Sequence, residues 1–109
     1  MRRIICHFKN GAEFLNHLER PNFAGNCKPK LKFLANFALS PGEIIRVTLV
    51  IEATGERHDL HLRVCERRPT MQYINRDRRW SCTAVATDGD APWLEMLAQK
   101  FQTAQRLSA

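Results

Sequence analysis

The sequence predicts a mainly β protein: a small antiparallel β-barrel of six or seven strands with a C-terminal α-helix. Two observations indicate this class. First, residues 44–51 and 58–65 alternate apolar and polar side chains on either side of Gly55, which is typical of a β-hairpin. Second, residues 93–104 place apolar side chains at helical spacing, while turn residues divide most of the preceding chain into short segments.

The hairpin around Gly55 is the strongest local signal in the chain. One face of its first strand collects the apolar side chains of Ile45, Val47, Leu49 and Ile51. The return strand has a matching apolar row of Leu60, Leu62 and Val64. Glycine accepts positive φ where the chain reverses, and Ser40-Pro41-Gly42 predicts another turn just before the first strand. We therefore expect a long antiparallel pair, apolar on one side and basic on the other.

The segment before this hairpin is less regular. Residues 3–9 alternate as a first strand, and Asn10-Gly11 indicates a turn after it. Residues 13–18 suit either a helical turn or a strand. Residues 19–30 contain two prolines, a glycine and two asparagines, so they predict a loop or a broken edge strand. Residues 30–37 regain enough apolar character for a strand.

After the hairpin, Pro69 is expected to end the return strand, because proline has no N–H to donate to a sheet. Residues 71–74 and 80–86 predict two more strands, joined by a charged turn over residues 75–79. Asp90 and Pro92 suit the first turn of a helix. We expect the apolar stripe of that helix to face the core. The stripe consists of Trp93, Leu94, Leu97, Ala98, Phe101 and Ala104.

The size and composition suit one globular domain over residues 1–109, with 44% apolar residues. No apolar run approaches the roughly 18 residues that a membrane span needs. The apolar run after Arg2 and Arg3 is too short for a secretory signal, so we expect a cytoplasmic protein. The net charge of +6 favours anionic partners, although a solvated basic face explains the charge equally well.

Nothing in the sequence predicts catalysis, a metal site or a cofactor. The cysteines are Cys6, Cys27, Cys65 and Cys82, and they form no C-x-x-C pair, so we expect buried reduced thiols rather than a zinc site. The four histidines accompany no recognisable nucleophile motif, and the chain contains no glycine-rich phosphate loop. We therefore expect a protein that is not an enzyme.

Arginines near two predicted strand ends form a candidate binding group. They are Arg67, Arg68, Arg76, Arg78 and Arg79, and Tyr73 and Trp80 lie near them if residues 71–74 pair with the strand from residue 80. Arginines beside aromatic rings suit phosphate contact and base stacking. A solvated charged turn is the simpler interpretation. The apolar stripe of the C-terminal helix would also allow a homo-oligomer.

Three segments resemble PilZ domains. Residues 39–49, Leu-Ser-Pro-Gly-Glu-Ile-Ile-Arg-Val-Thr-Leu, are similar to the leucine, turn, glycine and strand segment of that family. Residues 58–67 are similar to its next strand, and residues 80–86 with the segment from Asp90 are similar to its last barrel strand and terminal helix. The resemblance implies a six-stranded β-barrel. Many PilZ domains bind cyclic di-GMP through an R-x-x-x-R pair and a D/N-x-S-x-x-G motif.

The family motifs are incomplete in this chain. Arg2 and Arg3 precede the first strand, but they are adjacent, so their side chains diverge. Asn22 matches the second motif, whereas Ala24 and Cys27 occupy its serine and glycine positions. PilZ domains that lack both motifs are usually considered adaptors that act through protein contacts.

The resemblance therefore implies a non-enzymatic regulatory or adaptor module of the PilZ type in bacterial cyclic di-GMP signalling, with a protein partner. One alternative is a cyclic di-GMP receptor with non-standard contacts from Arg2 and Arg3, or from the turn that contains Arg76, Arg78 and Arg79. A further alternative is a small barrel that binds single-stranded nucleic acid, which we rank last.

Overall fold

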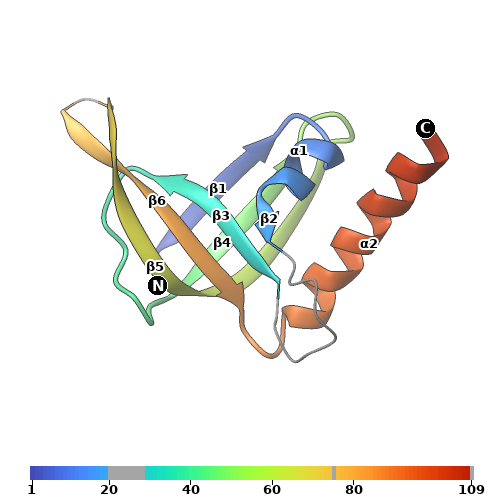
Figure 1. The fold of residues 1–109 in the computed structure, drawn as a ribbon. Coiled ribbons are helices and arrows are strands. Elements are labelled where there is room, and N and C mark those ends of the chain that lie inside the picture. Colours follow the sequence, from blue (N-terminus) through green and yellow to red (C-terminus); the bar gives the residue numbers. More distant parts are fainter. Residues whose placement is uncertain (20–28, 75, 109) are drawn as a thin grey trace.

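Six strands form one strongly curled mixed sheet, and two helices pack beside it (Figure 1). The computed structural model describes residues 1–19, 29–74 and 76–108. In chain order the elements are β1 (Arg3–Phe8), α1 (Gly11–Asn16), β2 (Leu18–Glu19), β3 (Lys30–Ala35), β4 (Ile44–Ile51), β5 (Glu56–Ile74), β6 (Asp77–Ala86) and α2 (Ala91–Ser108). The order across the sheet is β1-β4-β5-β6-β3-β2. The mainly β class and the C-terminal helix are thus confirmed.

The β4–β5 hairpin has the predicted register and faces. Ile45 lies opposite Leu62 and Val47 lies opposite Leu60, and all four side chains are buried. Gly55 has a φ of 76° in the reversal, a value that glycine adopts without the steric cost of a side chain. This pair forms the centre of the sheet and supplies much of its apolar inner face.

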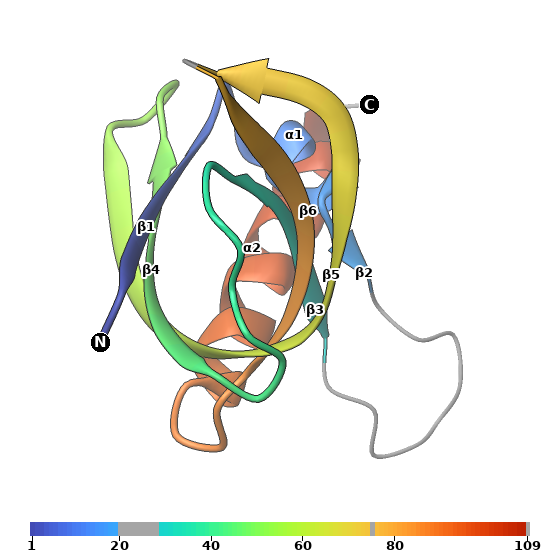
Figure 2. The ribbon, with the colours of Figure 1, turned by 90° about the vertical axis from the view of Figure 1, so that its left-hand side faces the viewer.

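The expected closed antiparallel barrel is wrong in two respects. β1 pairs with β4 in parallel, with Arg3 opposite Arg46. The sheet also stays open, because β1 and β3 do not pair and their Cα atoms lie more than 8 Å apart over nearly all of their length. The reason is the path of the chain after β1. The chain continues through α1, which lies beside the sheet, and β2 rather than β1 then pairs with β3 (Figure 2).

Helix α1 resolves the ambiguity of residues 13–18. Its N-cap is Asn10, whose side chain accepts a hydrogen bond from the Glu13 backbone N–H. A side chain at Gly11 would collide with the Phe101 ring, so glycine permits α1 to pack closely on α2. The expected turn at Asn10-Gly11 is therefore the start of a helix. The loop expected over residues 19–30 lies largely outside the described residues.

Strand β5 does not end at Pro69, contrary to the sequence prediction. It continues to Ile74, with Pro69 opposite Trp80 on β6. Register shifts between Val64 and Glu66 and between Pro69 and Tyr73 interrupt the regular ladder, which is where a residue without an N–H can be accommodated in a strand. Residues 71–74 thus belong to β5, and β6 begins at Asp77, inside the expected turn.

Helix α2 packs its apolar stripe against the open sheet and α1 (Figures 1 and 2). Leu94, Leu97, Ala98 and Phe101 are buried, as predicted. Trp93 was expected in the core but is 41% exposed, and its ring lies 5.6 Å from that of His58 at the rim. Ala104 is also exposed, because this part of α2 extends past the core.

The described cysteines are free thiols in two different environments. Cys6 and Cys82 are buried in the core, as expected, and burial raises the pKa of Cys6 to about 12. Cys65 is exposed, because it faces away from the core on β5. The prediction of burial is therefore wrong for Cys65. Cys27 lies outside the described residues.

Candidate functional site

Arg2 has a structural role. Its guanidinium donates two hydrogen bonds of 2.8 Å to the Glu43 carboxylate and a third of 3.2 Å to the Ala38 carbonyl. It also lies 5.1 Å from the centre of the Phe37 ring. These contacts lower the pKa of Glu43, chiefly through the Arg2 hydrogen bonds. Arg2 thus fastens the N-terminus to the turn before β4, and its donors are engaged within the protein.

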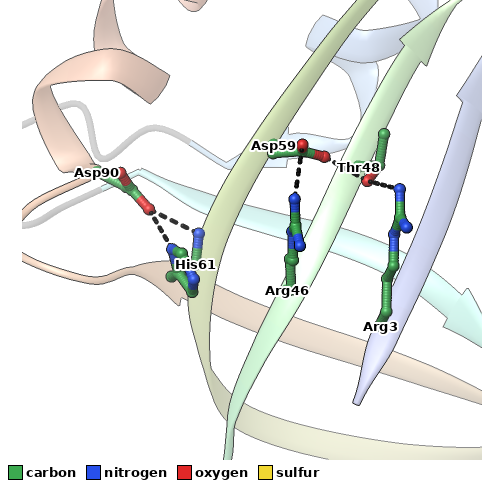
Figure 3. A network of polar contacts seen from close by, with 6 residues as sticks. All are labelled: Arg3, Arg46, Thr48, Asp59, His61 and Asp90. Atoms are coloured by element: carbon green, nitrogen blue, oxygen red, sulfur yellow. Dashed lines mark hydrogen bonds and ion pairs between the residues drawn. The ribbon is translucent and has the colours of Figure 1, made fainter. Parts of the chain in front are cut away.

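Arg3 diverges from Arg2, as the sequence predicted, and lies in a polar network on the outer face of the sheet (Figure 3). It donates to the Thr48 hydroxyl oxygen at 3.3 Å, and that hydroxyl donates to Asp59 at 2.5 Å. Arg46 binds the other carboxylate oxygen at 3.0 Å. The Thr48 hydrogen bond and then the Arg46 contact lower the pKa of Asp59. The network links β1, β4 and β5.

The gap in the sheet forms a cleft, which we call the β1–β3 cleft. It comprises two hollows of about 310 and 250 Å³, both lined by residues of β1 and β3. The larger hollow includes His7, Glu13, His17 and Lys32, and the smaller one includes Arg3, Asn36 and Phe37. Apolar atoms of Ile5 and Leu34 line both hollows. The cleft therefore combines basic and apolar surfaces.

Arg79 connects the two hollows of this cleft. Its side chain lines both of them, although the residue belongs to β6. Its Nε is buried and has no hydrogen-bond partner in the described part of the chain. A buried guanidinium N–H without an acceptor is costly, so Arg79 is a cation at the cleft with one unsatisfied donor.

The structure brings together only part of the predicted binding group. Arg3 and Arg79 line the same hollow, a pairing that the sequence did not suggest. Arg2 is held by Glu43, and Asn22 lies outside the described residues. The cleft itself was missed, because it depends on which distant strands fail to pair.

Arg76 and Arg78 lie on the arm, our term for residues 66–74 and 76–79 of the β5–β6 hairpin. The arm extends beyond β3, whose pairing with β6 stops at Trp80, and it projects at the upper left in Figure 1. Arg78 donates to the Tyr73 hydroxyl at 2.7 Å and lies over its ring. The predicted neighbourhood of arginines and aromatic rings is therefore present along the arm, whereas Arg79 turns to the cleft.

Apolar side chains are unusually accessible on this arm. Met71, Tyr73 and Ile74 are 89%, 54% and 40% exposed. Arg67 anchors the base of the arm, since it donates to the Leu39 carbonyl at 3.1 Å and lies over the Trp80 ring. The arm is thus a supported ribbon with apolar and cationic side chains directed to its surroundings.

A third hollow, of about 600 Å³, lies between α1, the β4–β5 turn and α2. Its surface is mostly apolar and includes Ala12, Ala53 and Phe101. Lys100 and Glu56 form an ion pair at this hollow, and Lys100 lowers the pKa of Glu56. No pattern in the sequence indicates this hollow, because its walls come from three distant segments.

The contact that most resembles a catalytic pair has a structural explanation. One oxygen of Asp90 accepts from the His61 backbone N–H at 2.7 Å and lies 3.0 Å from the His61 ring Nδ1 (Figure 3). The Thr87 backbone N–H donates in turn to the His61 carbonyl. These bonds fix the start of α2 against β5.

The described residues contain no cluster of three or more histidine, cysteine, aspartate or glutamate side chains arranged to hold a metal ion. Neither described helix is long and apolar enough to cross a membrane.

Comparison with known proteins found no matching family model and no matching curated protein. The resemblance to PilZ domains therefore stays a prediction from the residues that carry it.

Proposed function

We propose that this protein is a non-enzymatic regulatory or adaptor module of the PilZ type, which acts by binding a protein partner. The observation that carries the proposal is the arm, where three apolar side chains are exposed on a ribbon that projects from the sheet. Exposed apolar side chains gathered on one element mark interaction sites in globular proteins. The resemblance of residues 39–49 to PilZ domains supports a role in bacterial cyclic di-GMP signalling.

The charges of the arm favour a partner with an acidic surface. Its arginines outnumber its two acidic residues, Glu66 and Asp77. Such a surface accelerates association with a partner of opposite charge, and the apolar side chains then supply affinity. The expected complex forms faster at low ionic strength than at high ionic strength.

Photocrosslinking in cells of the source organism tests the proposal. A photoreactive residue at Met71 is expected to yield one dominant adduct with another protein, whereas one at Thr103, which is exposed on α2, yields none. Replacing Met71, Tyr73 and Ile74 with serine is expected to remove the complex and leave the melting temperature nearly unchanged. Equal adducts from both positions would overturn the proposal, and an adduct with a second copy would replace it with self-association.

A second function, a cyclic di-GMP receptor, is favoured by one observation: Arg3 and Arg79 line the same hollow. Two guanidinium groups at one hollow suit a ligand with phosphate groups. Calorimetric titration with cyclic di-GMP distinguishes the two functions. We expect no binding heat. A low-micromolar isotherm that disappears in the Arg3→Ala, Arg79→Ala double variant would establish the receptor function instead.

A further inference from the structure

The β1–β3 cleft is bordered by strand edges with unpaired backbone groups. The Arg2 carbonyl accepts from Arg46 of β4, and the Phe8 carbonyl accepts from Glu52, just after β4. Because alternate residues of a strand direct their backbone groups to opposite sides, Arg3, Ile5 and His7 direct theirs into the cleft. On β3, the Lys32 N–H donates to the His17 carbonyl, next to β2. Leu34 directs its backbone N–H and C=O to the same side as Lys32, at a position beyond the end of β2.

The separation of the two edges exceeds the spacing of paired strands. β1 and β3 lie more than 8 Å apart by Cα over nearly all of their length. Paired strands are about 4.8 Å apart, so one strand between two others needs roughly twice that distance. An extended segment placed in the cleft would complete the ladder that the protein leaves open.

We propose that the β1–β3 cleft binds an extended segment of a partner protein as an added strand beside β1, and that apolar and acidic residues alternate in this segment. Main-chain hydrogen bonds to Arg3, Ile5 and His7 would supply affinity, and side-chain pockets would supply specificity. The proposal deepens the adaptor function above and rests on it, because it states the chemistry of one partner segment.

The two faces of the cleft determine the alternation. Successive side chains of an added strand point to opposite sides of the sheet. On the inner side the cleft is lined by Cys6, Phe8 and Phe33, which suit apolar side chains. On the outer side it is lined by Arg3, Lys32 and Arg79, which suit carboxylates.

The charge balance at the cleft favours an acidic occupant. Lys32 forms an ion pair of 2.7 Å with Glu19, and Glu13 accepts from the Lys9 backbone N–H. Arg79 differs, because its buried Nε has no acceptor among the described residues. A carboxylate of the added strand would fill that role, so Arg79 is the residue whose loss is expected to weaken binding most through a side chain.

Selection from a displayed library of random nine-residue peptides tests the proposal with the intact protein. We expect the enriched peptides to alternate apolar and acidic residues and to slow the amide hydrogen exchange of Ile5 and His7. Failure to enrich any peptide would overturn the proposal. Enriched peptides without acidic residues, or without protection of these two amides, would overturn it too.

Three variants sharpen this test. Arg79→Ala is expected to lower the affinity for an enriched peptide about tenfold or more. Arg78→Ala changes the neighbouring residue, which binds Tyr73, and is expected to change that affinity less than about twofold. Ile5→Pro removes an edge N–H without touching the bonds to β4, and edge strands tolerate proline. We expect Ile5→Pro to abolish binding. If this variant fails to fold, an enriched peptide that is N-methylated at alternate residues is tested on the unaltered protein instead. Unchanged affinity of the methylated peptide would refute strand addition.

The outcomes separate this proposal from the adaptor function. An adduct from Met71 with no cleft-binding peptide would leave the adaptor function standing and remove the added strand. Peptides that bind the cleft in a protein whose Met71 gives no adduct would leave the added strand standing and remove the arm as a partner-binding surface.

Discussion

The two halves of β5 differ sharply, although they are one continuous strand. From Glu56 to Arg63 the strand pairs with β4, its pairing with β6 begins at Leu62, and Leu60, Leu62 and Val64 are buried. After Cys65 it pairs with β6 alone, and nearly every side chain is exposed. The strand pattern alone therefore says little about stability. The number of neighbouring elements determines whether a side chain supports the fold or faces a partner.

The largest effect is expected in the buried half. Leu62→Ala removes a completely buried side chain at the centre of the sheet, so it should lower the free energy of unfolding by about 2–5 kcal/mol. Urea denaturation followed by circular dichroism measures this. A loss below about 1 kcal/mol would contradict the distinction between the two halves.

A smaller effect is expected where this half meets α2. Asp90→Ala removes the acceptor of the His61 backbone N–H and ring, which should cost about 1–2 kcal/mol of unfolding free energy. His61→Ala keeps the backbone hydrogen bond, so its cost should be lower. If the His61 variant is the less stable of the two in thermal denaturation, the Asp90 contact is not what fixes the helix.

The buried half of β5 should also influence how the stability of the protein changes with pH. Thr48 and Arg46 lower the pKa of Asp59, so its carboxylate stabilises the folded state above the unfolded pKa of about 3.9. That contribution is lost as the pH falls through the lower, folded pKa. We expect Thr48→Val to raise the pKa of Asp59 in an NMR titration, and Asp59→Asn to reduce the loss of stability in acid. An unchanged pKa in Thr48→Val would show that the hydroxyl is not its main cause.

The smallest effect is expected on the arm. Met71→Ser alters a side chain that is almost entirely exposed, so the unfolding free energy should change by no more than about 0.5 kcal/mol. A destabilisation of 2 kcal/mol would mean that Met71 packs within the protein and would remove the arm from consideration as a binding surface.

The sequence predicted what depends on near neighbours and missed what depends on distant ones. The hairpin around Gly55 and the helix from residue 91 follow from local alternation and spacing, and both are present. Asn10-Gly11 by itself indicates a turn, but the spacing of Asn10 and Glu13 is a helix-start signal, and the structure has a helix there. At Pro69 a local rule failed, because irregular pairing with β6 tolerates proline.

The candidate site was harder to predict for the same reason. The arm follows from two short strands near each other in the sequence, so Tyr73 and Arg78 were correctly placed together. The cleft arises from the parallel pairing of β1 with β4 and from the sideways path through α1. No local pattern records such a pairing, so the meeting of Arg3 and Arg79 was not foreseen.

The parallel pairing of β1 with β4 has a consequence for protein synthesis. The chain leaves the ribosome N-terminus first, yet the partner of Arg3 is Arg46. Closing a loop of about forty residues has an entropic cost before its contacts form, so β1 joins the sheet only after β4 exists. A nascent chain arrested before β4 therefore displays β1 without its partner strand, as an unpaired segment that a chaperone can bind.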